Sequence, residues 1–207
     1  MRFFRSFLSD RRARVCLSSF LSSPFRLRRG VPQGSVLGPF LFLFFIDSLS
    51  TRLSSVPNIR FSLFANDLAV WSSSSSAAAA TRSVQSALNV IADWSELWLL
   101  RLNIDKCSSS FFSMDPRQSR LQPSLSLSGS LLNFVSAPTF LGVTLDRTLS
   151  FAPHVSRLHH SALPRILALK SLSSASFGPF LESLSLLYCS FIRSLPLLCS
   201  LLVSILL

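Results

Sequence analysis

The sequence predicts an α+β fold in which strands come first and helices come last. Two apolar runs, Ile59–Phe64 and Leu68–Trp71, flank the tip Ala65-Asn66-Asp67, a pattern typical of a β-hairpin. From Thr81 onward, apolar residues recur at helical spacing. The last part of the chain is also predicted to be helical. Strands followed by helices indicate the α+β class.

The N-terminal part combines a weak strand signal, a loop and a dense apolar segment. Arg14–Ser22 alternates weakly and predicts a strand, whereas the glycines and prolines of Arg28–Pro39 predict a loop. The next segment, PFLFLFFIDSL (Pro39–Leu49), is apolar on every side. We therefore expect it to be buried, whether it forms a helix or a strand.

The middle of the chain predicts a loop followed by an amphipathic helix. Ser72–Ala80 is a run of serines and then alanines, so the serines predict a flexible loop and the alanines the start of a helix. Thr81 is the expected N-cap. The helical stripe that follows predicts core positions, including both tryptophans: Val84, Ala87, Leu88, Ile91, Trp94, Leu97 and Trp98.

More strands are expected after this helix. Leu99–Asn103 and Cys107–Met114 are predicted strands around an Ile-Asp-Lys turn. Ser124–Val135 predicts a hairpin with a type II′ turn at Gly129-Ser130, because that turn favours glycine at its first central position. Thr139–Asp146 is expected to form one further strand.

Two C-terminal helices complete the predicted fold. His154–Ser171 is expected to be broken or kinked at Pro164, and Phe180–Leu207 is the last helix. The uncharged run Ser194–Leu207 is shorter than the roughly 20 residues that cross a bilayer, so no clear transmembrane segment is predicted.

The charge of the chain favours an anionic partner. Lys and Arg total 20 against 9 acidic residues, a net charge of +11, and all the basic residues except Lys106 and Lys170 are arginine. Arginine suits bidentate phosphate contacts, so nucleic acid is the leading partner, although a basic surface also suits an anionic membrane. The Arg-rich and Ser-rich segment Met1–Arg29 also has the composition of a mitochondrial transit peptide.

No metal or phosphate-loop motif is found in the sequence. The four cysteines form no C-x-x-C pair and predict free thiols, and the three histidines lack supporting ligands at zinc spacing. The spaced glycines Gly30, Gly34 and Gly38 lack the Gly-Lys-Ser/Thr of a Walker A loop.

Five blocks of the sequence carry a family resemblance. They are RRGVPQGSVLGPFLF (Arg28–Phe42), FANDLAVW (Phe64–Trp71), ALNVIADWSELWLLRLNIDKC (Ala87–Cys107), FLGVTLDRTLSFAPHV (Phe140–Val155) and LKSLSSASFGPFLESLSLLYCSFIRSLPLL (Leu169–Leu198). In order, they resemble motif B, the F/Y-A-D-D block of motif C, motif D, the F/Y-LGV-x-LD…H block and the helical tail of non-LTR retrotransposon (LINE-type, ingi-like) reverse transcriptases. The resemblance covers nearly the whole chain.

This resemblance implies a partial right-hand polymerase. Residues 1–136 would be part of the fingers and palm, starting after motif A, and residues 137–207 the palm–thumb junction and a helical thumb-like region. The family activity is RNA-directed DNA polymerase, which uses an RNA template, a DNA primer and dNTPs. Two Mg²⁺ ions clamp the attacking and leaving oxygens, and these ions require several charged oxygen ligands.

The resemblance also assigns residues. Asp67 matches the second Asp of motif C and would bind metal, whereas Asn66 stands where the first Asp belongs. Lys106 matches the motif D lysine, proposed to protonate pyrophosphate; the alternative is a solvated turn residue. Gln33, with Gly34 and Pro32, matches the positions near the incoming nucleotide and template; the alternative is that Gln33 only satisfies backbone groups in a turn. The motif A Asp has no match, since FLSDRR (Phe7–Arg12) resembles a later element.

Three hypotheses follow from the sequence. The first is a degenerate reverse transcriptase fragment, catalytically impaired and intracellular, in the nucleus or cytoplasm. The second is a non-catalytic remnant that binds nucleic acid non-specifically, and its expected phosphate contacts are Arg11, Arg12, Arg14, Arg28 and Arg29. The third is an imported (mitochondrial) or membrane-associated protein.

Overall fold

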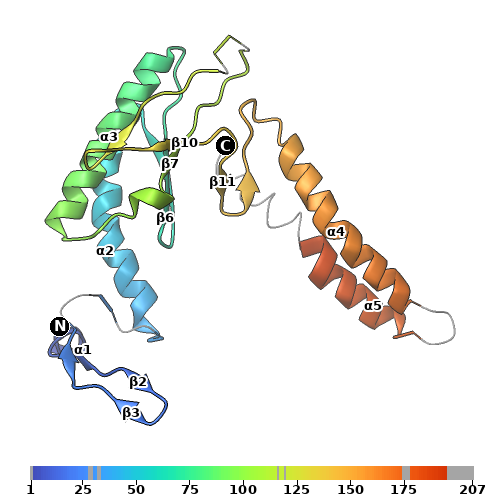
Figure 1. Cartoon of the computed structure of the whole chain (residues 1–207), viewed down its shortest axis with the longest axis horizontal. Coiled ribbons are helices and arrows are strands. Elements are labelled where there is room, and N and C mark those ends of the chain that lie inside the picture. The colour runs from blue at the N-terminus through green and yellow to red at the C-terminus, as the bar shows by residue number, and fades with distance from the viewer. Residues whose placement is uncertain are drawn as a thin grey trace. The chain divides into compact units, whose positions relative to one another are not determined.

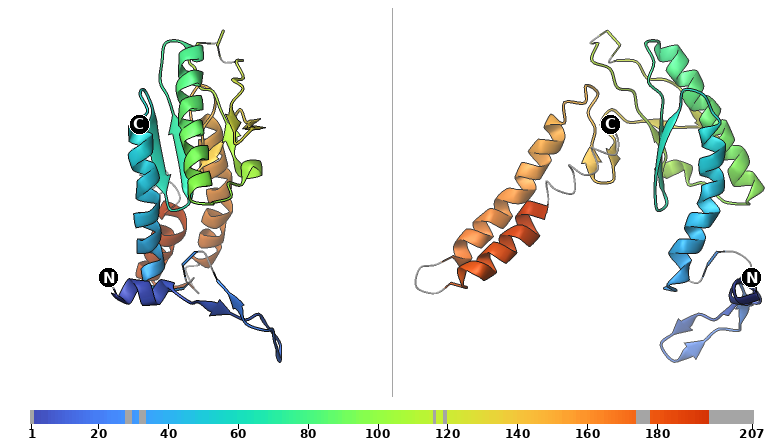
Figure 2. Two further views of the ribbon diagram at one scale, coloured as in Figure 1. Left: turned by 90° about the vertical axis from the view of Figure 1, so that its left-hand side faces the viewer. Right: turned by 180° about the vertical axis from the view of Figure 1, so that it is seen from behind.

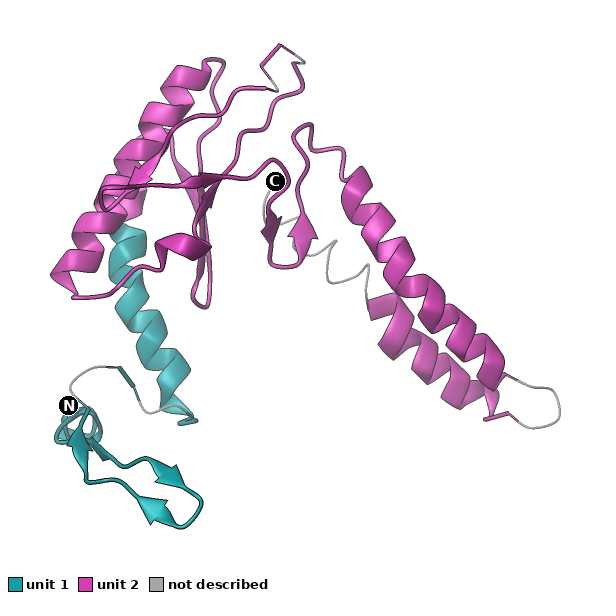
Figure 3. Cartoon of the chain, viewed as in Figure 1, with its two compact units in different colours: residues 1–52 teal, residues 53–207 magenta. Residues whose placement is uncertain are grey.

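The computed structural model divides the chain into two compact units, residues 1–52 and residues 53–207 (Figure 3). It describes residues 2–27, 30–31, 34–115, 117–118, 120–173 and 178–194. Helices and paired strands both occur, which confirms the α+β class. The predicted boundary between residues 136 and 137, which came from the family resemblance, stays a prediction.

The first unit contains two helices and two short antiparallel strand pairs. Its elements are α1 (Arg2–Leu8), β1 (Arg12–Ala13), β2 (Cys16–Leu17), β3 (Phe20–Leu21), β4 (Phe25–Arg26) and α2 (Leu37–Ser54), the last of which ends in the second unit. β1 pairs with β4 and β2 pairs with β3, so the chain makes one long hairpin. The single strand predicted over Arg14–Ser22 is wrong, because the chain reverses at Ser18, which has a φ of 54°.

Helix α2 contains the apolar segment Pro39–Leu49, and the prediction that this segment is wholly buried is wrong. Leu49 is buried, but Leu43 is exposed and the Phe44 side chain is 80% exposed. A helix that is apolar on every side buries only the side that meets a partner. By length and composition alone, α2 could cross a membrane, and no other described helix could; a core helix of a soluble protein passes the same test.

The core of the second unit lies between helix α3 (Ala77–Leu97) and strands (Figure 1). α3 packs against β6 (Asp67–Trp71), which pairs with β5 (Arg60–Phe64), and against β8 (Ser126–Leu127). Most of the predicted stripe is confirmed as core, and the Trp94 side chain is only 2% exposed. The buried apolar residues of α3 and of the segment around β8 are Ala87, Leu88, Ile91, Trp94, Leu125, Leu127 and Leu132.

The ends of α3 differ from the prediction. The helix begins at Ala77, as the alanine run indicated, and the hydroxyl of Thr81 donates to the Ala77 carbonyl from inside the helix, so Thr81 is not the N-cap. Leu97 is 61% exposed and Trp98 is 47% exposed, so the assignment of these two residues to the core is wrong. The helix ends at Leu97 and the chain turns at Leu99, with a φ of 54°, which places Trp98 beyond the packed face.

The remaining strands are short. β7 (Ser108–Ser109) pairs in parallel with β10 (Asn133–Phe134), and a 3₁₀ turn, Ile104–Lys106, precedes β7 as predicted. No strand forms over Leu99–Asn103, and only Ser108–Ser109 of the predicted strand Cys107–Met114 is one.

Two tight turns correct the predicted strand pattern. β8 and β9 (Ser130–Leu131) are joined by Ser128 and Gly129, both with positive φ, which is the type I′ pattern rather than type II′. The strand predicted over Thr139–Asp146 is instead a hairpin, β11 (Thr139–Phe140) and β12 (Val143–Thr144). Its turn residues Leu141 and Gly142 also have positive φ, 47° and 85°.

The C-terminal part is a helical hairpin. α4 (Ala152–Leu172) lies beside α5 (Leu181–Tyr188) and the π-helical segment Cys189–Arg193 (Figures 1 and 2). α4 continues through Pro164, so of the two predicted outcomes the break is wrong and the kink stays a prediction. The carbonyl that Pro164 cannot bond belongs to His160, an exposed residue. The predicted last helix is confirmed for Leu181–Arg193, and residues 195–207 lie outside the described part.

Candidate active site

The tip of the β5–β6 hairpin carries Asn66 and Asp67. Phe64 pairs with Asp67, so the turn consists of only two residues, Ala65 and Asn66. Of these two, only Ala65 has a positive φ, 50°, which is the pattern of a type II′ turn. That turn matches the right-handed twist of the strands, and the predicted hairpin is confirmed with Asp67 as the first residue of β6.

The register separates an apolar face of the hairpin from the face that carries Asp67. The cross-strand pairs Leu63–Leu68 and Phe61–Val70 lie on one face. Asp67 lies on the other face, together with its cross-strand partner Phe64 and the pairs Ser62–Ala69 and Arg60–Trp71. Asn66 and Asp67 are both exposed. The arrangement presents one amide and one carboxylate at the tip of a hairpin that α3 supports from β6.

The arginine-rich hairpin of the first unit is held by an ion pair. Arg26 donates to Asp10 Oδ1 from Nη2 at 2.7 Å and from Nε at 3.1 Å, and Arg12 lies 3.9 Å from Oδ2 of the same carboxylate. The hydrogen bond from Arg26, followed by the charges of Arg26 and Arg12, lowers the pKa of the Asp10 carboxyl. Asp10 therefore connects β1 and β4 through Arg12 and Arg26.

The predicted phosphate contacts differ in their surroundings. Arg11 donates to the backbone carbonyls of Leu8 and Gly30, so part of its guanidinium is already bound. Arg12 and Arg14 are exposed. Arg26, in the segment Arg26–Arg29 that was also expected to contact phosphate, lies opposite Arg12 in the β1–β4 pair and is bound to Asp10. Arg28 and Arg29 lie outside the described residues.

A second polar cluster lies where the β11–β12 hairpin meets α4. Asp146 accepts hydrogen bonds from the hydroxyls and backbone amides of Thr148 and Ser150, and from the backbone amide of Phe151 at 2.7 Å. These bonds, led by the Thr148 hydroxyl, hold the pKa of the Asp146 carboxyl well below its ordinary value. The loop Asp146–Phe151 is thereby fixed at the start of α4, close to the buried His154.

Comparison with known proteins places these features in one family. The sequence model described as "Reverse transcriptase (RNA-dependent DNA polymerase)" matches residues 3–145. The chain belongs to the reverse transcriptase family. The match begins at residue 3, so the Arg-rich N-terminal segment lies inside the family domain.

The curated relatives are polymerases of LINE-type elements. The chain is 34% identical over 161 residues to the RNA-directed DNA polymerase from mobile element jockey of Drosophila melanogaster, covering 76% of this chain and 17% of the relative. It is 34% identical over 155 residues to the probable RNA-directed DNA polymerase from transposon BS of the same fly, covering 73% and 17%. The corresponding protein from transposon X-element is 30% identical over 153 residues, covering 73% and 16%.

These relatives show that the chain is a LINE-type reverse transcriptase domain. The chain spans about a sixth of the length of the relatives that it matches (17%). No solved structure matches it significantly.

The residues that the structure describes do not form a site for two Mg²⁺ ions as expected for the family. Mg²⁺ prefers charged, hard oxygen ligands in octahedral geometry, and two ions need several carboxylates. The tip supplies the Asp67 carboxylate and the neutral Asn66 amide. Among the described residues, no three of His, Cys, Asp and Glu lie together as a metal site. Cys16, Cys107 and Cys189 are free thiols, as predicted.

Of the other residues assigned through motifs B and D, the structure describes Lys106 and Gly34. Lys106 is exposed on the 3₁₀ turn that follows α3 and makes no hydrogen bond or ion pair with Asn66 or Asp67, all three being described residues. Gly34 belongs to the first unit and adopts a φ of 81°, a left-handed conformation that explains the glycine. Pro32 and Gln33 lie outside the described residues.

Proposed function

We propose that the chain is a fragment of a LINE-type RNA-directed DNA polymerase whose own catalytic site is impaired. The observation that carries the proposal is the β5–β6 hairpin with Asn66-Asp67 at its tip, inside the region that matches the family. In this proposal residues 1–136 are partial fingers and palm of a right-hand polymerase, and residues 137–207 are the palm–thumb junction and a thumb-like helical region. RNA template, DNA primer and dNTP are the partners of the intact ancestor.

The impairment follows from charge at the hairpin tip. Holding two divalent cations within about 4 Å of each other requires carboxylates to offset their mutual repulsion. Asn66 offers an oxygen without a charge, and among the described residues no three His, Cys, Asp or Glu side chains lie together. Asp67 alone is too small a donor set, so no metal-dependent step is assigned to this chain.

Primer extension with the purified chain tests this proposal. With an RNA template, a DNA primer, dNTPs and either Mg²⁺ or Mn²⁺, we expect no extension above a no-enzyme control. Asn66→Asp alone is expected to leave the result unchanged, since one further carboxylate is still missing. Templated synthesis that Asp67→Ala abolishes would refute the proposal.

A second candidate function is sequence-independent binding of nucleic acid by the arginine-rich first unit. Arg12 and Arg14 are exposed there, and the net charge of the chain is +11. The logarithm of such a binding constant falls linearly with the logarithm of the salt concentration. The slope is roughly one unit for each phosphate contacted. Filter binding of a random-sequence oligonucleotide is expected to detect binding at low salt, with a smaller slope for Arg12→Gln/Arg14→Gln; no retention at low salt would exclude this function. An intracellular location, nuclear or cytoplasmic, accords with either function.

A further inference from the structure

The β11–β12 hairpin leaves one backbone donor pointing away from its partner strand. Phe140 pairs with Val143 next to the turn, and the Leu145 amide donates to the Pro138 carbonyl at 2.9 Å. Antiparallel ladders alternate hydrogen-bonded and non-bonded pairs, so the Thr144 amide, between these two, faces the outer edge of β12. A half-buried backbone amide in this position requires an acceptor from outside the hairpin.

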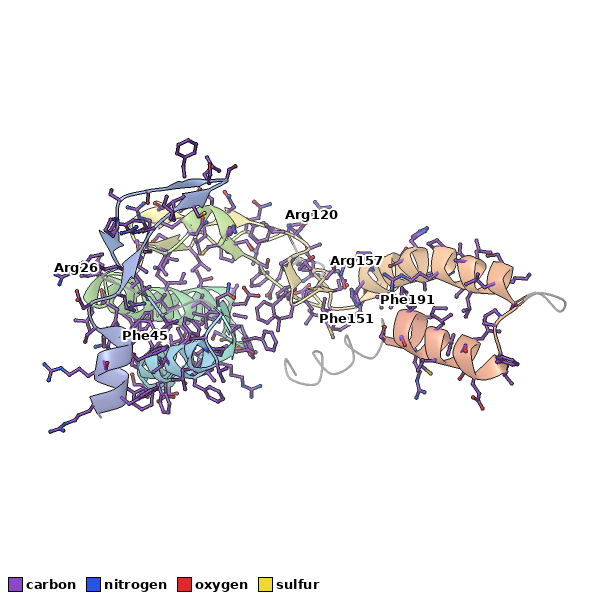
Figure 4. All side chains as sticks on the ribbon, turned by 90° about the horizontal axis from the view of Figure 1, so that it is seen from below. Arg26, Phe45, Arg120, Phe151, Arg157 and Phe191 are labelled. Atoms are coloured by element: carbon purple, nitrogen blue, oxygen red, sulfur yellow. The ribbon has the colours of Figure 1, made fainter. Side chains whose placement is uncertain are left out.

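His154 and Arg157, one turn apart on α4, bind this edge. The Thr144 amide donates to His154 Nδ1 at 3.3 Å. Arg157, labelled in Figure 4, donates to the Gly142 carbonyl in the turn and also lies 3.3 Å from His154 Nδ1. One imidazole and one guanidinium thus connect both the strand and the turn of the hairpin to α4. We call this pair the His154–Arg157 clasp.

The geometry fixes the protonation of His154. Two N–H donors, from Thr144 and Arg157, converge on Nδ1, so this nitrogen carries a lone pair and the proton is on Nε2. In a protonated imidazole both ring nitrogens are donors, so Nδ1 could no longer accept a hydrogen bond from Thr144 or Arg157. The side chain is only 4% exposed, and its burial together with the adjacent Arg157 charge lowers the pKa of His154 below its ordinary value of 6.5.

We propose that the His154–Arg157 clasp is an acid-releasable connection between the β11–β12 hairpin and α4. The clasp holds while His154 is neutral and opens when the imidazole is protonated. The proposal is independent of polymerase activity, because it concerns only the backbone of the hairpin and two side chains of α4. Opening would free the hairpin edge, while the loop Asp146–Phe151 would still connect the hairpin to α4.

The surrounding charges make His154 the group that responds to acid. β11 and β12 contain no ionisable side chain. On α4 the neighbouring charge is Arg157, which stays protonated at every relevant pH. In the connecting loop, the Asp146 carboxylate is bound by Thr148, Ser150 and Phe151, and Arg147 lies over the Phe134 ring at 5.3 Å.

The direction of the pH effect follows from the lowered pKa. When the clasp is open, His154 is in water and takes up a proton as the pH falls through 6.5, its ordinary value. When the clasp is closed, it takes up that proton only at a lower pH. The open state therefore binds more protons between these two pKa values, and acidification through that window favours opening.

Asparagine at position 154 is the matched variant. Its side-chain oxygen lies close to the position of Nδ1 and can accept from Thr144, but it does not titrate. It also removes Nε2, a buried atom for which no described residue provides a partner. Glutamine, by contrast, extends its amide toward the position of Nε2 and does not replace the Nδ1 acceptor. His159→Asn, at an exposed histidine of the same helix, is the control.

Amide NMR of the full-length, ¹⁵N-labelled chain between pH ~7.5 and ~5 tests the clasp. We expect the Thr144 amide resonance to titrate together with the His154 imidazole, with a midpoint below 6.5. Its protection factor against hydrogen exchange should fall about tenfold or more, while the Ile91 amide in α3 keeps its protection. His154→Asn should abolish this pH dependence, His154→Gln should lower Thr144 protection at every pH, and His159→Asn should behave as the parent.

Three results would overturn the proposal. A Thr144 resonance in the parent protein that does not change over this range would exclude release, and this measurement needs no variant. Loss of Thr144 and Ile91 protection at the same midpoint would indicate global unfolding instead of local opening. A His154→Asn protein that titrates as the parent does would assign the acid response to another group.

Discussion

Gln85 is predicted to account for a measurable part of the stability of the second unit. Its side-chain amide lies between α3 and β8, donating to the Ser126 carbonyl at 2.9 Å and accepting from the Ser126 amide at 2.9 Å. The two residues are 41 positions apart, so these bonds join distant parts of the chain. At about 1 kcal/mol per net hydrogen bond, Gln85→Ala should lower the free energy of unfolding by roughly 2 kcal/mol.

The Gln85→Glu variant separates the two hydrogen bonds to Ser126; Gln85 Nε2 also donates to Asn89 Oδ1 at 2.9 Å within α3. The carboxylate keeps the acceptor for the Ser126 amide, but it loses the donor and places a negative charge against the Ser126 carbonyl. We therefore expect it to be destabilised by at least as much as Gln85→Ala, in spite of its similar size. Ser86→Ala is the control, because the exposed Ser86 hydroxyl bonds only the Arg82 carbonyl of its own helix. It should change stability by less than about 0.5 kcal/mol.

Urea unfolding, followed by tryptophan fluorescence to which the buried Trp94 contributes, measures these differences. Hydrogen exchange of the Ser126 amide gives a local readout, since that amide should lose protection in Gln85→Ala. A Gln85→Ala protein as stable as Ser86→Ala, or a Gln85→Glu protein as stable as the parent, would refute the assignment of these bonds.

Two further substitutions probe strained or polar turns. Ala65→Gly at the tip of the β5–β6 hairpin should raise the free energy of unfolding by about 0.5–1 kcal/mol, because relief of the left-handed conformation (φ 50°) outweighs the entropy of glycine; a lower urea midpoint would contradict this. Asp146→Asn should lower the melting temperature most at neutral pH. Since the pKa of the Asp146 carboxyl is lowered in the folded state, its contribution is present above its ordinary value of 3.8 and is lost at more acidic pH. The difference between parent and variant should shrink as the pH falls below 3.8, and a constant difference would exclude this role for Asp146.

The sequence predicted best those features that depend on local pattern. The β5–β6 hairpin and the core stripe of α3 follow from apolar periodicity; the hairpin is confirmed, and the stripe is confirmed at Ala87, Leu88, Ile91 and Trp94. Periodicity does not report where the backbone takes a positive φ. Leu141 in the β11–β12 turn and Ser18 in the β2–β3 turn do so, although neither residue type favours it, and both predicted single strands are hairpins for that reason.

Contacts between distant residues were the least predictable part. Nothing in the local sequence indicates that Asp10 pairs with Arg26, or that Arg157 reaches the Gly142 carbonyl, because each contact depends on a chain reversal between the two residues. The exposure of α2 was missed for a related reason. An apolar run predicts a tendency to be buried, while burial itself depends on which surfaces meet that run.

The matched blocks divide into residues that shape the fold and residues that would perform chemistry. In the block Phe140–Val155, Gly142 allows the turn, Asp146 organises the loop and His154 binds the edge of β12. Each of these roles is filled by a contact within the chain. At the hairpin tip the backbone geometry is likewise formed, but Asn66 stands beside Asp67 and supplies no charge. Similarity to the family across these blocks therefore indicates that the fold is retained. Whether metal chemistry is supported is a separate question, and it depends on the number of carboxylates at the hairpin tip.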